Sequence, residues 1–287
     1  MKSDGLQEQL QEIPQVPTWM QTRSEVAVGW KRAIARHAST HLIEYGSAVQ
    51  MGAGTTFSML MDEIVAQQVQ TKKSLDLIVM TTNLEVMAKG RDARMVHADL
   101  LQSMQIILTG GSLQSSLGAL VGPYAVEGIR AEKIRPNVVF FGAAGVSFAN
   151  GLSIRYQFAD ELATQEAYAT RPTDARVLLC DHTKLGRQCG WQAEITVDAA
   201  LAHTDKFLII TTYPAENQEE CIRLGEQIQA FDKMLDGLAT DDRLDPKDFA
   251  LRLINLDGEV VKELSLVERR REMSTRLSSS KISTLPV

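Results

Sequence analysis

Short apolar runs alternate along the chain with segments of helical periodicity. Runs of four to seven apolar and β-branched residues between helices are typical of strands that are buried on both faces. The pattern therefore predicts an α/β fold, with a mostly parallel sheet and helices on both of its faces. The expected strands are residues 47–51, 75–80, 104–108, 138–141, 176–180, 194–197 and 207–211.

Helical patterns fill the segments between these strands, and a different pattern follows the last of them. Two apolar runs around Asp257-Gly258, at 249–255 and 259–264, predict a hairpin with a tight turn. A charged loop is expected before it, at 241–248. The expected helices are residues 26–45, 57–66, 84–89, 118–133, 158–170 and 214–236.

The two ends of the chain differ from its middle. Residues 1–24 are polar, contain Pro14 and Pro17, and are expected to form an arm. Residues 25–265 are expected to form one main domain, because no linker rich in Pro or Gly interrupts the alternation. Residues 266–287 contain three consecutive arginines and a serine run, and we expect a disordered tail there, with the arginines solvated or in weak contact with nucleic acid.

Composition limits the class of protein without naming it. The 287 residues are 44% hydrophobic and 23% charged, and the net charge of −6 argues against broad affinity for a nucleic-acid backbone. The three cysteines have no disulfide or zinc spacing, which fits a reducing compartment, with Cys180 as a buried core thiol. No signal peptide and no membrane-length apolar run is visible, so we expect a cytoplasmic protein without metal or cofactor.

Small or polar motifs follow five of the expected strands. The carboxyl ends of parallel strands meet at one edge of a sheet, where open α/β folds bind ligands, so these motifs are expected to line one pocket. They are Met51-Gly-Ala-Gly-Thr-Thr56, Thr81-Thr-Asn83, Gly110-Gly111, Phe141-Gly-Ala-Ala-Gly145 and Asp181-His-Thr-Lys-Leu-Gly186.

The first motif indicates an anion site. Gly52 and Gly54 permit close backbone approach, and the helix that follows Thr55 and Thr56 would present free N–H groups to a phosphate or carboxylate. The alternative is a tight turn with Thr55 as a helix cap and no ligand.

The next three motifs are more ambiguous. Asn83 is expected to cap a helix, either alone or while also contacting a sugar hydroxyl. Gly110 and Gly111 mark a turn and give possible backbone access to a ligand. Gly142 and Gly145 are ligand-binding candidates too, although small residues at this place also suit packing under a helix.

The last motif carries the most chemistry. Lys184 can meet an anionic ligand while Asp181 holds the lysine or a sugar hydroxyl, or the two can form a surface ion pair. His182 is the one histidine that we keep as a pocket residue. Glu161, on the preceding helix, is either a site residue or part of a solvated face, and Glu166 is expected to be solvated.

In this order, together with Lys31-Arg-Ala-Ile-Ala35 and Gly151-Leu-Ser153, the motifs resemble the effector-sensing domain of the DeoR family of bacterial sugar-metabolism repressors, over roughly residues 25–212. The resemblance implies the fold shared by ribose-5-phosphate isomerase, glucosamine-6-phosphate deaminase and CoA transferases. It also implies a phosphorylated sugar or similar small anion as ligand, and self-association, for which residues 26–45 and the C-terminal hairpin are candidate surfaces. A glutamate near Glu161 belongs to the family pattern, although its spacing to Asp181 differs by one residue.

The resemblance also shows what this sequence does not display. Members of the family begin with a helix-turn-helix of about 55 to 60 residues, whereas 30 residues precede Lys31. Three accounts remain: a sensor that acts through partners and does not bind DNA directly, a sugar-phosphate isomerase or related enzyme on the same scaffold, or a reading frame that begins upstream. An enzyme would use Asp181, Lys184 and Glu161 as its catalytic groups, but the strand end from Gly142 to Gly145 lacks the carboxylates expected of isomerases and deaminases, so we expect binding without turnover.

Overall fold

The computed structural model describes residues 27–131, 133–149, 152–156, 159–187, 191–193, 197–241, 244 and 247–282. Its central sheet consists of β1 (Ala48–Met51), β2 (Ile78–Thr81), β3 (Gln105–Leu108), β6 (Val138–Gly142), β9 (Ala175–Leu179), β11 (Lys206–Thr212), β12 (Asp248–Ile254) and β13 (Val260–Ser265). The strand order is β13-β12-β11-β9-β6-β1-β2-β3, and every neighbouring pair is parallel except β12 with β13. The predicted mostly parallel sheet is therefore confirmed, as is the C-terminal hairpin.

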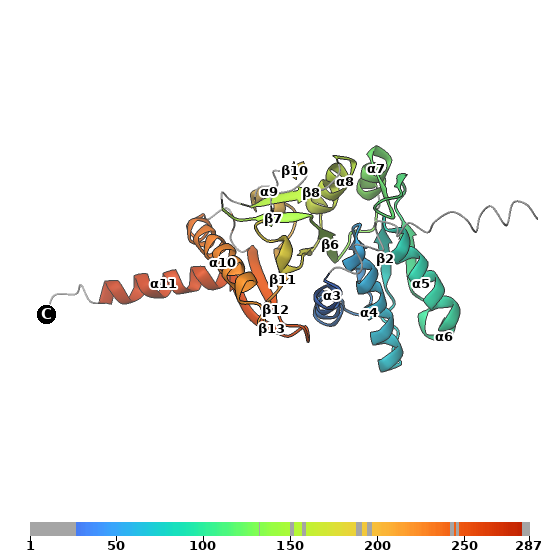
Figure 1. The fold of residues 1–287 in the computed structure, drawn as a ribbon, viewed down its shortest axis with the longest axis horizontal. Helices are drawn as coiled ribbons and strands as arrows, with labels where there is room; N and C mark the ends of the chain where they lie inside the picture. The colour runs from blue at the N-terminus through green and yellow to red at the C-terminus, as the bar shows by residue number, and fades with distance from the viewer. Residues whose placement is uncertain are drawn as a thin grey trace, which may run out of the picture.

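Helices cover both faces of the sheet, as predicted (Figure 1). One face carries α3 (Val28–Leu42), α4 (Thr55–Thr71), α5 (Leu84–Val96) and the short α6 (Ala98–Leu101). The other face carries α7 (Pro123–Ala131), α8 (Ala159–Thr170), α9 (Val197–Leu201) and α10 (Gln218–Leu238). A small sheet of β7 (Gly145–Ser147), β8 (Ser153–Tyr156) and β10 (Trp191–Ala193) lies on this second side. No helix within the described part of the chain combines the length and the apolar character needed to cross a bilayer.

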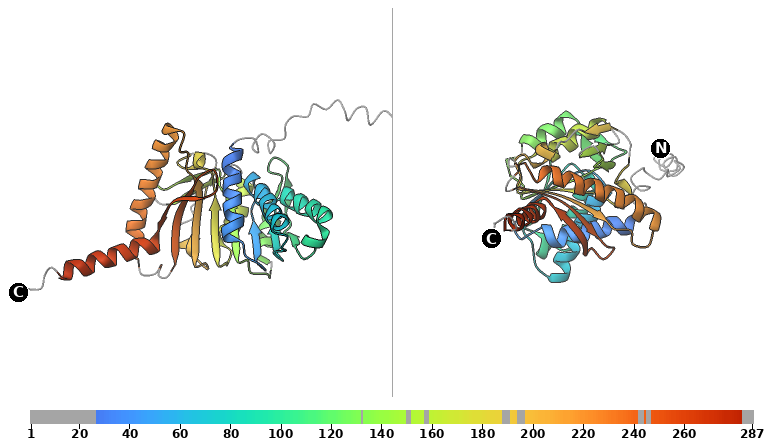
Figure 2. Two further views of the ribbon diagram at one scale, coloured as in Figure 1. Left: turned by 90° about the horizontal axis from the view of Figure 1, so that it is seen from below. Right: turned by 90° about the vertical axis from the view of Figure 1, so that its left-hand side faces the viewer.

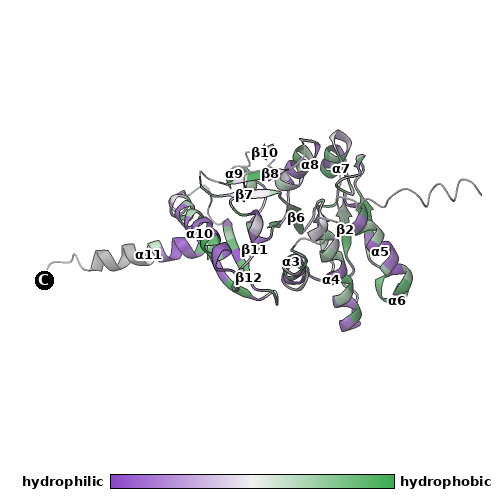
Figure 3. Cartoon of the chain, in the orientation of Figure 1, coloured by the Kyte–Doolittle hydropathy of each residue, from purple (hydrophilic) through white to green (hydrophobic). Residues whose placement is uncertain are grey.

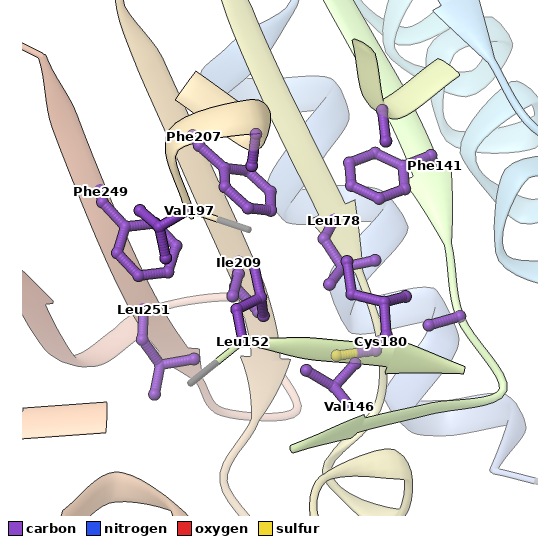
Figure 4. Packing of buried hydrophobic residues seen from close by; sticks show 14 of the residues in the cluster. Phe141, Val146, Leu152, Leu178, Cys180, Val197, Phe207, Ile209, Phe249 and Leu251 are labelled. Atoms are coloured by element: carbon purple, nitrogen blue, oxygen red, sulfur yellow. The ribbon is translucent and has the colours of Figure 1, made fainter. Parts of the chain in front are cut away.

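Each face of the sheet has its own hydrophobic core, because successive strand residues point to opposite sides. On the side of α10, Phe141 stacks against Phe207 at 5.9 Å between ring centroids, and Phe207 meets Phe249 at 5.4 Å (Figure 4). Burying one such side chain contributes about 1.5–3 kcal/mol. Cys180 lies in the same core, fully buried, and burial raises the pKa of its thiol to about 12, which confirms it as a core thiol. Figure 3 shows hydrophilic residues along the outer helices α5 and α10.

The helix predicted at 118–133 begins later than expected. Its first residues form β5 (Ala119–Val121), which pairs with β4 (Ser112–Gln114) in a hairpin, and α7 starts only at Pro123. Gly118 and Gly122 both adopt positive φ, at 60° and 87°, which interrupts a helix on either side of β5. Proline suits the first turn of a helix, where its missing N–H has no partner to lose.

Two further expectations need correction. The strand expected at 194–197 is wrong for Val197, which begins α9, and 194–196 lie outside the described residues. A strand, β10, lies just before them at Trp191–Ala193. The expected disordered tail is wrong for 266–282, which form the helix α11 (Leu266–Ile282) extending from the body of the molecule (Figure 2). Leu266 is fully buried, and Arg269 pairs with Asp232 and, at 3.4 Å, with Asp236 of α10. The expected arm at 1–24 and parts of the loop at 241–248 also lie outside the described residues.

The C-terminal hairpin folds back onto α3. The Nδ1–H of His37 donates a hydrogen bond of 2.7 Å to the carbonyl of Gly258 at the hairpin turn, and Arg252 of β12 donates to His37 Nε2 at 3.1 Å. A side chain at Gly258 would come within 3.3 Å of the Ala33 carbonyl, so the turn lies directly on the helix. Burial, with lesser effects of Arg252 and His41, lowers the pKa of His37 to about 4. The imidazole is therefore neutral in the folded protein and joins the two ends of the described chain.

This pairing predicts a pH dependence of stability. An unfolded His37 takes up a proton near its ordinary pKa of about 6.5, whereas the folded one does so only near 4. The unfolded chain thus binds more protons in this window, and the free energy of unfolding should fall as the pH drops from 6.5 towards 4. In His37→Asn, whose amide can still donate to Gly258 but cannot be charged, urea unfolding at a series of pH values should show a shallower fall. Parallel curves for the two proteins would contradict this role of His37.

Candidate functional site

The order of strands reverses between β1 and β6. From β1 the chain continues to β2 and β3 on one side, while β6, β9, β11 and β12 follow on the other. In open α/β sheets ligands bind beyond the carboxyl ends of the strands at such a switch point. The N–H of Gly52 donates to the Phe140 carbonyl at 2.9 Å, which holds the turn after β1 against β6. The Gly52–Thr56 turn therefore lies at the switch point.

The N-terminus of α4 is formed without a side-chain cap. Gly54 occupies the N-cap position with a φ of 130°, and α4 begins at Thr55, so the interpretation of Thr55 as the cap is wrong. Thr55 and Thr56 are almost fully buried, and the first turn has no acidic residue. The free N–H groups and the positive end of the helix dipole therefore meet no negative side chain of their own helix, an arrangement that favours a bound anion.

Glycines at two neighbouring strand ends serve close packing. A Cβ atom at Gly142 would lie 3.3 Å from the ring of Phe57 in α4, and one at Gly145 would lie 2.3 Å from the carbonyl of Arg187. The Gly186 N–H donates to the carbonyl of Val146 at 2.6 Å in the same contact. Packing thus explains why glycine occupies both positions. Gly145 in addition allows the loop that carries Asp181 and Lys184 to pack closely against β7.

Asn83 links the first turn to the next helix. Its side-chain oxygen accepts from the N–H groups of Glu85 and Val86, at 3.0 and 3.3 Å, which confirms the predicted cap of α5. Its Nδ2 donates to the Gly54 carbonyl at 3.0 Å, and the residue is fully buried. Asn83 therefore positions the Gly52–Thr56 turn, and its polar atoms are engaged with backbone.

Gly110 and Gly111 form the turn after β3 that leads into the β4–β5 hairpin. Both have positive φ, at 87° and 126°. A Cβ atom at Gly110 would meet nothing within 4 Å, whereas one at Gly111 would lie 2.8 Å from the Cβ of Ala125 in α7. Gly110 thus leaves open backbone at the edge of the sheet, and Gly111 is needed for packing.

Asp181 lies buried at the end of β9, with 3% of its surface exposed, and is not part of a surface ion pair. Burial pushes the pKa of this carboxyl upward, but the positive charge of Lys184, the hydroxyl of Thr183 and the positive charge of Lys31 more than offset it and hold the pKa below its ordinary value. Lys31 comes from the N-terminal end of α3, is itself only 5% exposed, and lies about 150 residues away along the chain. The edge therefore combines an ionised carboxylate with two cations.

His182 fastens this loop to its neighbours. Its ring nitrogens lie 2.7 Å from Thr212 Oγ1 at the end of β11 and 2.9 Å from Glu220 Oε2 of α10. Its backbone N–H also donates to Thr212 Oγ1, and the ring of Trp30 meets its ring edge-on at 5.2 Å between centroids. Both ring nitrogens are thus engaged, and His182 holds the short helix η1 (His182–Lys184) in place.

The side of the turn opposite α4 is covered by α8. A Cβ atom at Gly52 would lie 3.1 Å from Oε1 of Gln165, and Glu161 lies one helical turn before Gln165, on the same side of α8. Glu161 is 7% exposed, so the interpretation as a solvated face is wrong for it. Gln50, on the same face of β1 as Gly52, is fully buried, and within the described residues neither of its side-chain polar atoms has a hydrogen-bond partner, nor does Gln165 Oε1.

The structure thus brings the predicted residues to one edge with differing exposure and roles. The Gly52–Thr56 turn follows β1, and Asp181 and Lys184 follow β9; these two strands flank β6. Sequence reasoning missed Lys31, Gln50 and Gln165 as parts of this edge. The available signal for Lys31 was its place in the Lys31–Ala35 motif, near the N-terminal end of the predicted helix 26–45. Among the described residues no cluster of three or more His, Cys, Asp or Glu side chains is arranged to hold a metal ion.

Solved structures with a related arrangement are distant. Ribose 5-phosphate isomerase A from Methanocaldococcus jannaschii shares 14% identity with a TM-score of 0.36, over 54% of this chain and 53% of that one. Ribose 5-phosphate isomerase from Plasmodium falciparum shares 13% identity with a TM-score of 0.36, over 54% and 52%. For eIF2B delta from Chaetomium thermophilum the identity is 12% and the TM-score 0.38, over 63% and 56%. The chain thus spans about half the length of these structures.

No curated protein matches the sequence. A family model, by contrast, matches residues 27–206, from the start of α3 to the start of β11, and it is the model of the DeoR C-terminal sensor domain. The match covers more than half of the 287 residues and contains the five strand-end motifs. The chain therefore belongs to the DeoR family, of which it carries the C-terminal sensor domain.

Proposed function

We propose that this chain senses a small phosphorylated sugar, or a similar small anion, at the carboxyl edge of its sheet and works as part of a regulator. The observation that carries the proposal is the N-terminus of α4 at the switch point, which lacks a side-chain cap and follows Gly52 and Gly54. A phosphate placed there meets N–H donors and the positive end of the helix dipole.

The charged groups on β9 fit the other end of such a ligand. β1 and β9 are separated by β6, so the Gly52–Thr56 turn and Asp181 lie about 10 Å apart, twice the spacing of neighbouring strands. That is the length scale of a phosphorylated sugar. In this arrangement Asp181 accepts hydrogen bonds from sugar hydroxyls, while Lys184 and Lys31 keep it ionised and meet electron-rich oxygens of the ligand.

The buried amides support a polar ligand at this edge. Leaving an amide buried without a hydrogen bond costs about 1–3 kcal/mol. Gln50 and Gln165 bear such unpaired atoms, and Gln165 directly adjoins Gly52. A ligand rich in hydroxyl groups would supply donors and acceptors to groups of this kind.

An enzyme on the same scaffold is the second candidate, and the observation in its favour is the buried, ionised Asp181 beside Lys31 and Lys184. Against it stands the end of β6, where Gly142 to Ser147 contain no carboxylate. An aldose–ketose isomerisation needs a base over the substrate carbon and a group that stabilises the enediolate. We therefore favour binding without turnover.

The first prediction concerns binding. In calorimetry against a panel of sugar phosphates and the matching unphosphorylated sugars, at least one phosphorylated ligand should bind and its parent sugar should not. Lys184→Ala should weaken that binding by about 1.5–3 kcal/mol, the range for a charge-assisted hydrogen bond. Lys262→Ala, a change of the same kind at an exposed position of β13, serves as the control and should bind as the wild type does. If the folded wild type binds no phosphorylated ligand, the proposal fails.

A second prediction separates sensor from enzyme. Incubated with the sugar phosphate that it binds, neither the wild type nor Asp181→Asn should convert it, as followed by NMR of the ligand. The substitution should weaken binding, because it removes the acceptor charge between the two lysines. Conversion by the wild type that Asp181→Asn abolishes, with binding retained, would establish the enzyme instead.

A third prediction concerns self-association, which we propose as part of the regulatory role. Most of α3 is covered by α4 and the hairpin, and its most exposed residues include the polar Arg32, Arg36 and Thr40, so the hairpin is the better of the two candidate surfaces. Val260 and Val261 of β13 are each about half exposed at the edge of the sheet. Light scattering at micromolar concentration should give a multiple of 31.7 kDa, and Val261→Lys should shift it towards that value. If the wild type is monomeric, the proposed self-association is wrong, and with it the role of the hairpin as its surface.

A further inference from the structure

A basic hollow lies at the opposite edge of the sheet from the candidate site. It has a volume of about 260 Å³ and forms where α7 and α8, which pack side by side (Figure 1), run into the starts of β6 and β9. Among the described residues its lining includes four basic side chains, Arg130, Lys133, Arg135 and Arg171, together with Thr170, Ala167 and Pro172, and no acidic one. In a chain with 36 acidic and 30 basic residues, this local excess of positive charge requires an explanation.

Two of the four cations have structural roles. Arg171 is 7% exposed, and its guanidinium donates a hydrogen bond of 2.8 Å to the carbonyl of Ile134, in the loop between α7 and β6. Arg135 pairs with Asp174 at 2.9 Å, and the other carboxylate oxygen of Asp174 accepts from Asn137. The negative ends of the α7 and α8 dipoles also favour cations here. These contacts account for Arg171 and Arg135.

Arg130 and Lys133 are not accounted for in this way. Both are exposed, and within the described residues neither has an ion pair or a side-chain hydrogen bond. They lie beside the paired Arg135 and the buried Arg171 around one small hollow, and an anion that enters it is attracted by these cations. Guanidinium and ammonium groups converging from two chain segments are the arrangement that recognises phosphate oxygens.

The size of the hollow limits the ligand. At roughly 30 Å³ for each water-sized group, it holds about nine non-hydrogen atoms, as many as a pyrophosphate contains. We propose that this hollow is a second anion site, which binds a compact phosphate or diphosphate group and is distinct from the sugar-phosphate site at the carboxyl edge. The length of β6, about 15 Å, separates the two edges, so both sites can be filled together.

The hollow favours a small anion over nucleic acid. Arg171 is almost fully buried, so a phosphate must enter the concave surface to reach it, whereas a duplex backbone would meet only the exposed cations at its rim, Arg130, Lys133 and the paired Arg135. Binding of a duplex further depends on many phosphate contacts, and the net charge of −6 opposes it.

The test uses the full chain and inorganic pyrophosphate, with calorimetry and thermal melting as readouts. The double variant Arg130→Glu/Lys133→Glu should lower the affinity for pyrophosphate by about 100-fold or more, since two charge-assisted contacts are lost. Both residues are exposed, so the variant should fold. The control Lys262→Glu/Arg271→Glu makes the same change of net charge at exposed positions of β13 and α11 and should bind as the wild type does.

Two further measurements identify the source of the phosphate group and distinguish the two sites. Binding of adenosine diphosphate is compared with binding of pyrophosphate. Tighter binding of either ligand supports the site and shows whether the diphosphate group belongs to a nucleotide or is free. Lys184→Ala should leave pyrophosphate binding at the hollow intact, so a failure of the sugar-phosphate proposal does not touch this one. No pyrophosphate binding by the wild type, equal losses in variant and control, or preferential binding of a 20-base-pair duplex would each overturn the proposal.

Discussion

The pairing of β1 with β6 is the constraint on which the site depends. β1 sends the chain to one side of the sheet and β6 sends it to the other, so two crossovers diverge at the ends of this pair. The bond from Gly52 to the Phe140 carbonyl extends this pairing into the turn itself. The free end of α4 is therefore fixed by the sheet and does not depend on a flexible loop.

Close backbone contacts also fix the loops at the carboxyl edge of the sheet. At Gly145 and Gly142 the chain comes so near to Arg187 and Phe57 that a single added methyl group would push the loop or the helix away. The loop is then held at three more points by His182, which reaches Thr212, Glu220 and Trp30. Asp181 is consequently buried within a loop held in place on several sides, and its charge is stabilised by Lys184, by the hydroxyl of Thr183 and by Lys31.

Much of the fold could be predicted because the strands are buried on both faces and stand out as apolar runs. The β4–β5 hairpin escaped prediction, since strands of only three residues are too short to carry a periodic signal. Within the site, the glycine turn and Asp181 were visible because strand-end position alone identifies them. Lys31 and Gln165 were not, because their proximity arises from the packing of α3 and α8 against the strand ends. α11 was mistaken for a tail because its partners, Asp232 and Asp236, lie on another helix.

The contact between His37 and Gly258 has a consequence for how the chain is made. It joins residues 221 positions apart, and Gly258 lies more than 50 residues beyond the end of the family match at 206. During synthesis His37 emerges 221 residues before Gly258, so α3 remains partly uncovered until the hairpin has been made. A fragment cut at the boundary of the family match would lose this cover together with β12, β13 and nearly all of β11. The unit that folds is thus larger than the unit that sequence comparison delimits.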